Sequence, residues 1–309
     1  MVESTTQQPR LAGVELGGTK CVVVLGAGHA IVAREQFPTT TPDETLSRAA
    51  QILRQWDMAE PLAALGIASF GPVRIDPAAT DFGSILTTPK PGWAGAQVLA
   101  RLQSAIAGPI GLDTDVNAAA LAEHAHGAAR GCSNVVYLTI GTGLGGGVLT
   151  EGRPVHGALH PEIGHIRLRR ASGDSFAGIC PFHGDCVEGL IAGPALAERL
   201  GGRAAELAPS DPAWRFVAHD LAQLIACLML TFSPHRIVIG GGVALGQPHL
   251  IDSARLQVPA LLADYLGALD AAKMEDLVRP ATLGENAGPI GALVLAAGAL
   301  ARQEEKALD

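Results

Sequence analysis

Three clusters of glycine constrain the fold of this chain more than any other feature of its sequence. They lie at Gly17-Gly18, within Gly141 to Gly147, and at Gly240 to Gly242, each beside an apolar run typical of a β-strand. The 38 glycines are about 12% of the 309 residues, against a usual share of ~7%. Because glycine has no Cβ atom, a glycine turn at a strand end lets the backbone approach a ligand closely. A single cluster is often purely structural, whereas three clusters need a common explanation.

The first two clusters belong to two similar β-hairpins. The runs LAGVELGG and KCVVVLG are joined by Gly17-Gly18-Thr19, and a second hairpin joins strands at 134–140 and 146–150 through the turn at 141–145. A shift of 124 residues overlays Gly17 on Gly141 and Val24 on Val148. This weak internal repeat predicts an α/β fold with two similar domains around a central cleft, the kind of place where ligands bind.

Helix and strand patterns alternate along the rest of the chain. Thr41-Pro42-Asp43-Glu44 is a capping box with proline at the first helical position, which predicts a helix over 42–56. We expect further strands at 30–37, 64–70, 110–112 and 236–240, and further helices at 94–107, 116–125, 188–200, 211–232, 249–266 and 289–303. The predicted N-terminal domain is 1–117 plus the C-terminal helix at about 289–309, and the C-terminal domain is 118–288.

Composition and charge exclude several classes of protein. The net charge of -8 and the pI of about 5.7 argue against nonspecific binding to nucleic acid or to anionic membranes. No run approaches 18 uncharged apolar residues, and the polar start MVESTTQQPR has no signal-peptide core. Five cysteines in a chain of this length do not form a disulfide framework. We therefore expect a soluble cytoplasmic protein with no nucleic-acid partner and no membrane partner.

The glycine turns are candidates for phosphate binding. Gly17, Gly18, Thr19 and Lys20 lie at a strand-to-strand turn, so they match neither the Walker A nor the dinucleotide-binding context. Their backbone N–H groups and the Thr19 hydroxyl can still bind a phosphate, although an ordinary hairpin turn explains this motif equally well. The loop containing Thr142 and Gly143 indicates phosphate binding more strongly, since each of its glycines costs conformational entropy.

Asp113-Thr114-Asp115-Val116-Asn117 joins a short strand to a helix. Asp and Thr are preferred helix caps, which is one interpretation of the motif. A carboxylate at a strand end that faces a cleft is also suited to act as a general base toward a hydroxyl. The motif alone leaves both interpretations open.

A metal site is indicated by His165, Cys180, His183 and Cys186. Cys180-x2-His183-x2-Cys186 has the compact spacing of zinc ligands, and His165 precedes it by a loop. Four N and S ligands leave no open position, which predicts a structural, tetrahedral Zn²⁺ site. The alternative is a core histidine beside idle thiols.

Taken together and in order, ELGGTK, the Asp-Thr-Asp-Val-Asn helix entry, IGTGLGGG, HPEIGH, CPFHGDCVEG and IGGGVA resemble the ROK family (repressors, open reading frames, kinases), in particular its bacterial fructokinases. The resemblance extends from about Gly13 to about Leu300 and is most specific over HPEIGH and CPFHGDCVEG. It implies an actin-like, hexokinase-type ATPase fold, ATP-dependent phosphorylation of a hexose, ATP with Mg²⁺ as the phosphoryl donor, and a homodimer.

Site residues carried over from the family follow its motifs one by one. Asp115 matches the catalytic base. The hexose-hydroxyl contacts match Glu162, His165 and Glu188, and His165 also matches a zinc ligand. Contacts with ATP match Gly17, Gly18, Thr19, Lys20, Thr142, Gly143, Gly241 and Gly242.

Two departures from the family pattern favour one hexose among the candidate substrates. Thr114 replaces the asparagine usual in the glucokinases, and Cys180-Pro-Phe-His183 replaces their three-cysteine cluster; both changes favour D-fructose, phosphorylated at its 6-hydroxyl. A glucokinase, a mannokinase or a broad hexokinase remains the alternative. Glu15 stands where many members have aspartate, so its contact with Mg²⁺-bound water stays open. A sugar-responsive repressor is disfavoured because only about 12 residues precede Gly13, too few for a DNA-binding domain.

Overall fold

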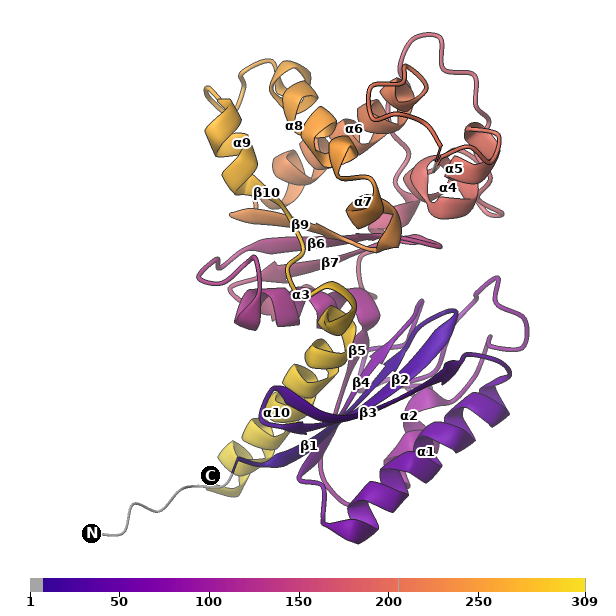
Figure 1. The fold of residues 1–309 in the computed structure, drawn as a ribbon. Coiled ribbons are helices and arrows are strands. Elements are labelled where there is room, and N and C mark those ends of the chain that lie inside the picture. Colours follow the sequence, from indigo (N-terminus) through magenta and orange to yellow (C-terminus); the bar gives the residue numbers. More distant parts are fainter. Residues whose placement is uncertain (1–7, 205, 309) are drawn as a thin grey trace. The chain divides into compact units, whose positions relative to one another are not determined.

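The described residues, 8–204 and 206–308 of this computed structural model, form two compact units. Unit 1 takes its residues from Met1–Ala122, His156–His160 and Glu285–Asp309, and unit 2 from Glu123–Val155 and Pro161–Gly284. Each unit is built on one five-stranded mixed sheet with helices packed against it (Figure 1). The functional domain boundaries at 117/118 and 288/289 stay a prediction.

The sheet of unit 1 has the strand order β3-β2-β1-β4-β5. Its strands are β1 (Arg10–Leu16), β2 (Lys20–Ala27), β3 (Ala30–Pro38), β4 (Ala64–Ser69) and β5 (Ile110–Thr114). β1 pairs with β2 and β2 with β3 in antiparallel fashion, whereas β1–β4 and β4–β5 are parallel. The parallel strands therefore end together, and β5 delivers Asp113 and Thr114 to that edge.

Helices cover both faces of this sheet. α1 (Pro42–Ala59) and α2 (Val98–Gln103) lie on one face, and α10 (Ala287–Leu308) lies on the other (Figure 1). Glycine allows α10 to pack closely, since a Cβ atom on Gly66 would lie 1.7 Å from the Ala292 carbonyl oxygen. The prediction of a helix over 94–107 is wrong at both ends, because Gly95 adopts a φ of 81° and the chain ends its helical course at Ser104.

The sheet of unit 2 has the order β10-β9-β6-β7-β8. Its strands are β6 (Val135–Ile140), β7 (Leu144–Thr150), β8 (Arg153–Pro154), β9 (Arg236–Gly240) and β10 (Val278–Pro280). Read from β8 to β10, this order repeats that of unit 1, with antiparallel pairs at the same places and parallel pairs at the same places. The prediction of two similar α/β halves is thereby confirmed.

The helices of unit 2 are shorter and more numerous than the sequence pattern indicates. They are α4 (Val187–Ile191), α5 (Gly193–Arg199), α6 (Trp214–Phe232), α7 (Gly242–Gly246), α8 (Pro248–Leu262) and α9 (Ala271–Leu277). The helix expected over 188–200 is broken at Ala192, which is extended because Pro194 cannot continue the hydrogen-bond ladder. β7 begins at Leu144 rather than at 146, and β8, β10, α7 and α9 were not predicted.

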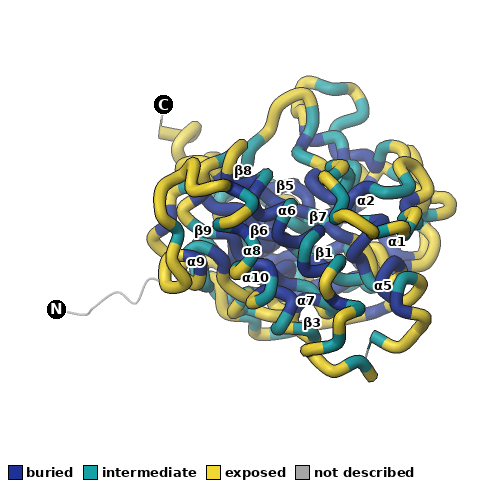
Figure 2. The backbone as a smooth tube through the Cα atoms, turned by 90° about the horizontal axis from the view of Figure 1, so that it is seen from above, coloured by how far each residue is buried: buried dark blue, intermediate teal, exposed yellow. Residues whose placement is uncertain are grey.

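α3 (Asp115–His126) begins in unit 1 and ends in unit 2. α6 is the one described helix that is long and apolar enough to cross a membrane, but most of its residues are buried against its own unit. The inner strands are buried, whereas the edge strand β3 and many connecting loops are exposed (Figure 2). The cores of the two units are therefore the sheets and the helix faces that cover them.

Candidate functional site

In unit 1 the turn between β1 and β2 has carbonyl groups that accept hydrogen bonds from a neighbouring segment of the chain. Gly17 N–H donates to the Lys20 carbonyl (3.0 Å), the Thr39 hydroxyl donates to the Gly17 carbonyl (2.8 Å), and Thr39 N–H donates to the Thr19 carbonyl (2.9 Å). A Cβ atom on Gly17 would crowd the Lys20 carbonyl oxygen at 3.0 Å, whereas Gly18 faces open space. Thr39, a buried residue that sequence reasoning missed, thus braces the predicted phosphate turn.

Glu15 precedes this turn on β1 and points at the first turn of α10. A Cβ atom on Gly288 would lie 2.1 Å from its Oε1, so glycine makes room for this carboxyl group. Burial raises the pKa of Glu15 to about 7, opposed by the charges of Lys20 and Arg34. Among the described residues its Oε2 has no hydrogen-bond partner. The helix N-terminus beside it favours the charged form.

The Asp113–Asn117 motif is held rigidly at the junction of β5 and α3. Asp113 is buried; its Oδ1 accepts from Thr114 N–H (2.8 Å) and Asn117 Nδ2 (2.7 Å), and its Oδ2 lies 3.0 Å from His156 Nε2. That hydrogen bond raises the pKa of His156. The Thr114 hydroxyl accepts from Asn117 N–H (3.1 Å) and so caps α3. The Thr114 hydroxyl therefore supplies the N-terminal cap of α3, and Asp113 fixes the backbone just before it.

Asp115 is the first residue of α3 and is half-buried. Its Oδ1 accepts from Val116 N–H at 2.9 Å. This contact holds the carboxyl group at the N-terminal end of α3. The structure thus places Asp115 at the start of α3, directly after β5, and its role as a base stays a prediction. His156, which lies beside Asp113, is a residue that sequence reasoning did not select.

In unit 2 the glycine loop at 141–143 is shaped by Glu188. The Glu188 Oε2 accepts from Leu144 N–H (3.0 Å), and a Cβ atom on Gly143 would lie 2.9 Å from the same oxygen. The break between α4 and α5 serves this loop too, because Gly193 N–H donates to the Gly141 carbonyl (2.7 Å). Glu188 therefore contacts the predicted phosphate loop itself, in addition to the sugar role that the resemblance implies.

Gly143→Ala is expected to weaken both MgATP and sugar binding, because the added methyl group displaces the Glu188 carboxylate from the loop. Steady-state KM values for both substrates measure this. Gly246→Ala is the control, since a Cβ atom there meets nothing within 4 Å. If the KM values for Gly143→Ala match those for Gly246→Ala, the loop has no role in binding.

Gly241 and Gly242, which the resemblance matches to ATP contacts, lie beside this loop within unit 2. Gly241 has a φ of 87°, and a Cβ atom on it would lie 2.4 Å from the Ile140 carbonyl oxygen. Both constraints require glycine. Gly242 starts α7 and faces open space, and its N lies 3.9 Å from the Cβ position of Gly141. Gly141 and Gly242, from the second and third glycine clusters, are therefore neighbours, as a shared ligand would require.

Glu162 precedes a short 3₁₀ turn, η1 (Ile163–His165), that carries His165. Although Glu162 as a residue is exposed, desolvation of its carboxyl group, together with the negative charge of Glu188, raises its pKa to about 7. Two carboxyl groups close enough to influence each other form a hydrogen-bonding surface suited to a polyol.

The kcat/KM for the sugar is expected to rise with pH through about 7, because Glu162 must ionise before it can accept hydrogen bonds from two hydroxyls. The pH profile of Glu162→Gln should lack this rise, whereas Glu151→Gln, at an exposed turn of the same unit, should keep it. A profile of Glu162→Gln that keeps the wild-type shape would contradict the assignment.

The four predicted metal ligands come together in unit 2. The ligand atoms of His165, Cys180, His183 and Cys186 all lie within 4.8 Å of one another. The His165 Nδ1 lies 3.5 Å from Cys186 Sγ and 3.8 Å from Cys180 Sγ, and His183 Nδ1 lies 3.7 Å from Cys180 Sγ. A tetrahedral Zn²⁺ with bonds of ~2.3 Å to sulfur and ~2.0 Å to nitrogen would set N···S separations of about 3.5 Å. The donor set and its spacing fit the ion.

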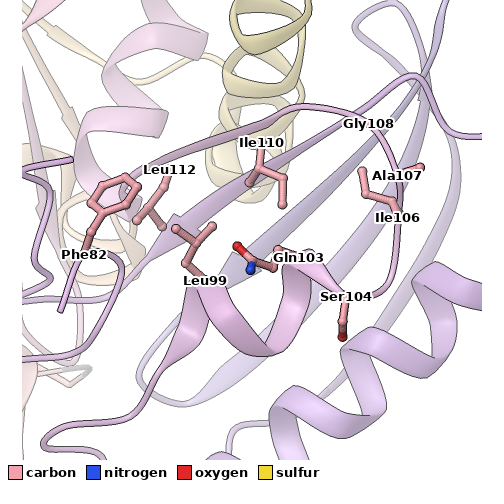
Figure 3. Close-up of a pocket in the computed structure, with 9 residues that line it drawn as sticks. All are labelled: Phe82, Leu99, Gln103, Ser104, Ile106, Ala107, Gly108, Ile110 and Leu112. Carbon is pink, nitrogen blue, oxygen red and sulfur yellow. The ribbon is translucent and has the colours of Figure 1, made fainter. Parts of the chain in front are cut away.

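A hollow of about 470 Å³ in unit 1 contains none of the predicted site residues. It is lined by residues of α2, of β5 and of the loops beside them, among them Leu99, Ile106 and Leu112 (Figure 3). The candidate site is thus defined by its motifs and hydrogen bonds rather than by this hollow.

Comparison with known proteins links these motifs to one family. Residues 11–299 match the ROK family. A fructokinase of Zymomonas mobilis is 40% identical over 292 residues, 93% of this chain and 96% of that protein, and a fructokinase of Pediococcus pentosaceus is 39% identical over 291 residues, 94% and 98%. The crystal structure of a ROK hexokinase from Thermus thermophilus superposes with a TM-score of 0.75 at 26% identity, covering 96% of this chain and 99% of that one.

Proposed function

The chain belongs to the ROK family, and on that premise we propose that it is an ATP-dependent fructokinase that transfers the γ-phosphoryl group of ATP to the 6-hydroxyl of D-fructose. The observation that carries this proposal is the full-length similarity to two fructokinases at 39–40% identity. Features within each unit support it. The turns at Gly17–Lys20 and Thr142–Gly143 can bind phosphates, and Asp115 can accept a hydroxyl proton. Glu162 and Glu188 can hydrogen-bond a polyol.

The glycine turns hold the phosphates. Phosphoryl transfer needs positioning and charge stabilisation more than covalent chemistry, and backbone N–H groups at Gly17–Lys20 and at Thr142–Gly143 supply fixed donors. Gly241 and Gly242 receive the adenosine. Mg²⁺ bound with ATP would neutralise phosphate charge. The half-buried Glu15, whose buried Oε2 lacks a partner among the described residues, fits the oxygen chemistry of that ion or its water.

Asp115 takes the proton of the attacking hydroxyl as its oxygen bonds to the γ-phosphorus, while the bond from that phosphorus to the β–γ bridging oxygen breaks and ADP leaves. Thr114 and Asp113 fix the helix end on which it stands, so the carboxylate keeps one orientation. Glu162, His165 and Glu188 bind the sugar hydroxyls, and a site built to pair hydroxyls rejects analogues that lack them.

His165, Cys180, His183 and Cys186 hold one Zn²⁺ that has a structural role. With four protein ligands the ion has no open position, so it supplies fixed loop geometry rather than an activated water. His165 is both a ligand and the last residue of η1, so a bound ion would fix the segment that begins at Glu162. We also propose that the enzyme is a cytoplasmic homodimer that acts without nucleic-acid or membrane partners.

Assay of ADP release across fructose, glucose, mannose and N-acetyl sugars tests the substrate. Fructose should give the highest kcat/KM. A higher value for glucose or mannose would replace fructokinase by the glucokinase or mannokinase alternative, and equal values would indicate a broad hexokinase.

A further inference from the structure

A second residue besides Thr39 holds the carbonyl groups of the Gly17–Thr19 turn in unit 1. This residue, Lys90, belongs to none of the sequence motifs and has no role above. Lys90 Nζ donates to the Gly18 carbonyl at 2.6 Å and to the Thr39 carbonyl at 3.3 Å. With the two bonds from Thr39, every carbonyl of Gly17, Gly18 and Thr19 is then engaged by a donor. Because a carbonyl oxygen repels phosphate, the turn is left to present N–H groups only.

Two N–H groups of the same turn are unpaired among the described residues, as an anion-binding turn requires. Within residues 8–204 and 206–308, the N–H groups of Gly18 and Thr19 have no acceptor, and both residues are exposed. Successive unpaired N–H groups of this kind bind anions. The turn is therefore arranged as an anion site on which Lys90 acts from one side.

Lys90 is mounted on a rigid support. Lys90 is the first residue of a turn over residues 90–93, in which Trp93 N–H donates to the Lys90 carbonyl (3.2 Å). Trp93 is fully buried, packs edge-on against Phe70 at 5.1 Å between ring centroids, and donates through Nε1 to the Thr40 carbonyl (2.8 Å). The prolines at 89 and 91 further restrict the backbone on both sides.

The charge of Lys90 is not neutralised by a carboxylate. In the described part of the chain Lys90 has no ion-pair partner, whereas Lys20, the lysine that the sequence motif singled out, has its Nζ 3.9 Å from Glu285 Oε2. An ammonium group has three N–H donors, and two of those of Lys90 are used by carbonyls. One donor and a full positive charge remain beside the turn.

We propose that Lys90 is a phosphate-binding residue: its remaining N–H donates to a phosphate oxygen of ATP held at the Gly17–Thr19 turn, while its other two donors hold the Gly18 and Thr39 carbonyls away. This rests on the proposed kinase function for the identity of the anion. A charged hydrogen bond of this kind stabilises the bound phosphate and the charge that develops during transfer.

Two substitutions separate the positive charge of Lys90 from its hydrogen bond to the Gly18 carbonyl. Lys90→Gln keeps a donor for the Gly18 carbonyl but removes the charge, and Lys90→Arg keeps both. Lys90→Gln is expected to lower kcat/KM for MgATP by at least about tenfold, the scale of a hydrogen bond to a charged group, with the fructose KM unchanged. Lys90→Arg should recover most of this loss. Lys273→Gln is the matched control, because Lys273, an exposed residue of α9, also donates through Nζ to a backbone carbonyl, that of Ala268 (2.8 Å).

Binding measured without sugar distinguishes a failure of this inference from a failure of the proposed function. By calorimetry Lys90→Gln should bind MgADP and inorganic tripolyphosphate more weakly than the wild type does, and adenosine equally well. The proposal would be overturned if Lys90→Gln bound both anions with wild-type affinity. It would also be overturned if the variant lost affinity for adenosine as much as for the anions and melted at a lower temperature than the wild type. A wild-type enzyme inactive on fructose would count against the proposed substrate and leave these binding results as the test of Lys90.

Discussion

Asp115→Asn lowers kcat by at least about 100-fold, the usual scale of general-base catalysis, and leaves the KM for fructose close to the wild-type value. The amide keeps the shape of the side chain and can still accept from Val116 N–H, so the start of α3 is preserved. It cannot accept the proton of the sugar hydroxyl. Single-turnover rates with saturating MgATP and fructose isolate the affected step from product release.

Asp270→Asn is the matched control for this substitution. Asp270 caps α9 through a hydrogen bond from Lys273 N–H (2.8 Å), so it is also an aspartate at a helix start, but it belongs to no proposed site. Both variants should melt close to the wild type, and only Asp115→Asn should lose kcat. Near-wild-type turnover by Asp115→Asn would remove Asp115 from the base role.

Cys180→Ser loses the bound Zn²⁺ and raises the fructose KM by roughly 10- to 100-fold, while the KM for MgATP stays near that of the wild type. Cys180 Sγ lies within reach of both histidine ligands, so its loss opens the cluster that holds η1 and, with it, Glu162. Metal analysis of the purified protein should give about one zinc per wild-type chain. Because the thiols must lose their protons to bind the ion, zinc affinity should fall as the pH falls.

Cys227→Ser is the control for the zinc prediction, since Cys227 lies on α6 outside the cluster. It should keep its zinc and its fructose KM. Metal-free wild-type protein with full activity on fructose would contradict a role for the ion in the sugar site.

Local chemistry explains which parts of the fold could be predicted from the sequence. The hairpins follow from alternating apolar runs around glycine, and α1 begins at its capping box, where the Thr41 hydroxyl accepts from Glu44 N–H. For the matching strand order of the two sheets, the residue pattern offered one signal, the overlay of the first hairpin on the second after a shift of 124 residues. The short β8 and β10 depend on pairing with β7 and β9, which no local pattern shows. The break at Ala192 does have a local signal, Pro194, and the hydrogen bond from Gly193 to Gly141 then fixes it against the glycine loop.

The candidate site divides in the same way. Residues within a motif, such as Asp115 or the Cys180–Cys186 loop, are visible in sequence because their spacing is local. Thr39, Lys90 and His156 reach their positions through contacts over 20 or more residues: Thr39 to Gly17, Lys90 to Gly18 and His156 to Asp113. Only folding brings these pairs together. The sole signal in sequence was the rigid Pro-Lys-Pro-Gly-Trp run around Lys90.

The central claim, transfer of phosphate from ATP to the 6-hydroxyl of fructose, is tested most directly by identifying the product. Purified enzyme, MgATP and fructose are incubated, and the sugar phosphate is converted by phosphoglucose isomerase and glucose-6-phosphate dehydrogenase, which report fructose 6-phosphate as NADPH. We expect one NADPH for each ADP formed, and loss of both signals in Asp115→Asn. ADP formed without NADPH, or no ADP in the presence of fructose, would contradict the claim.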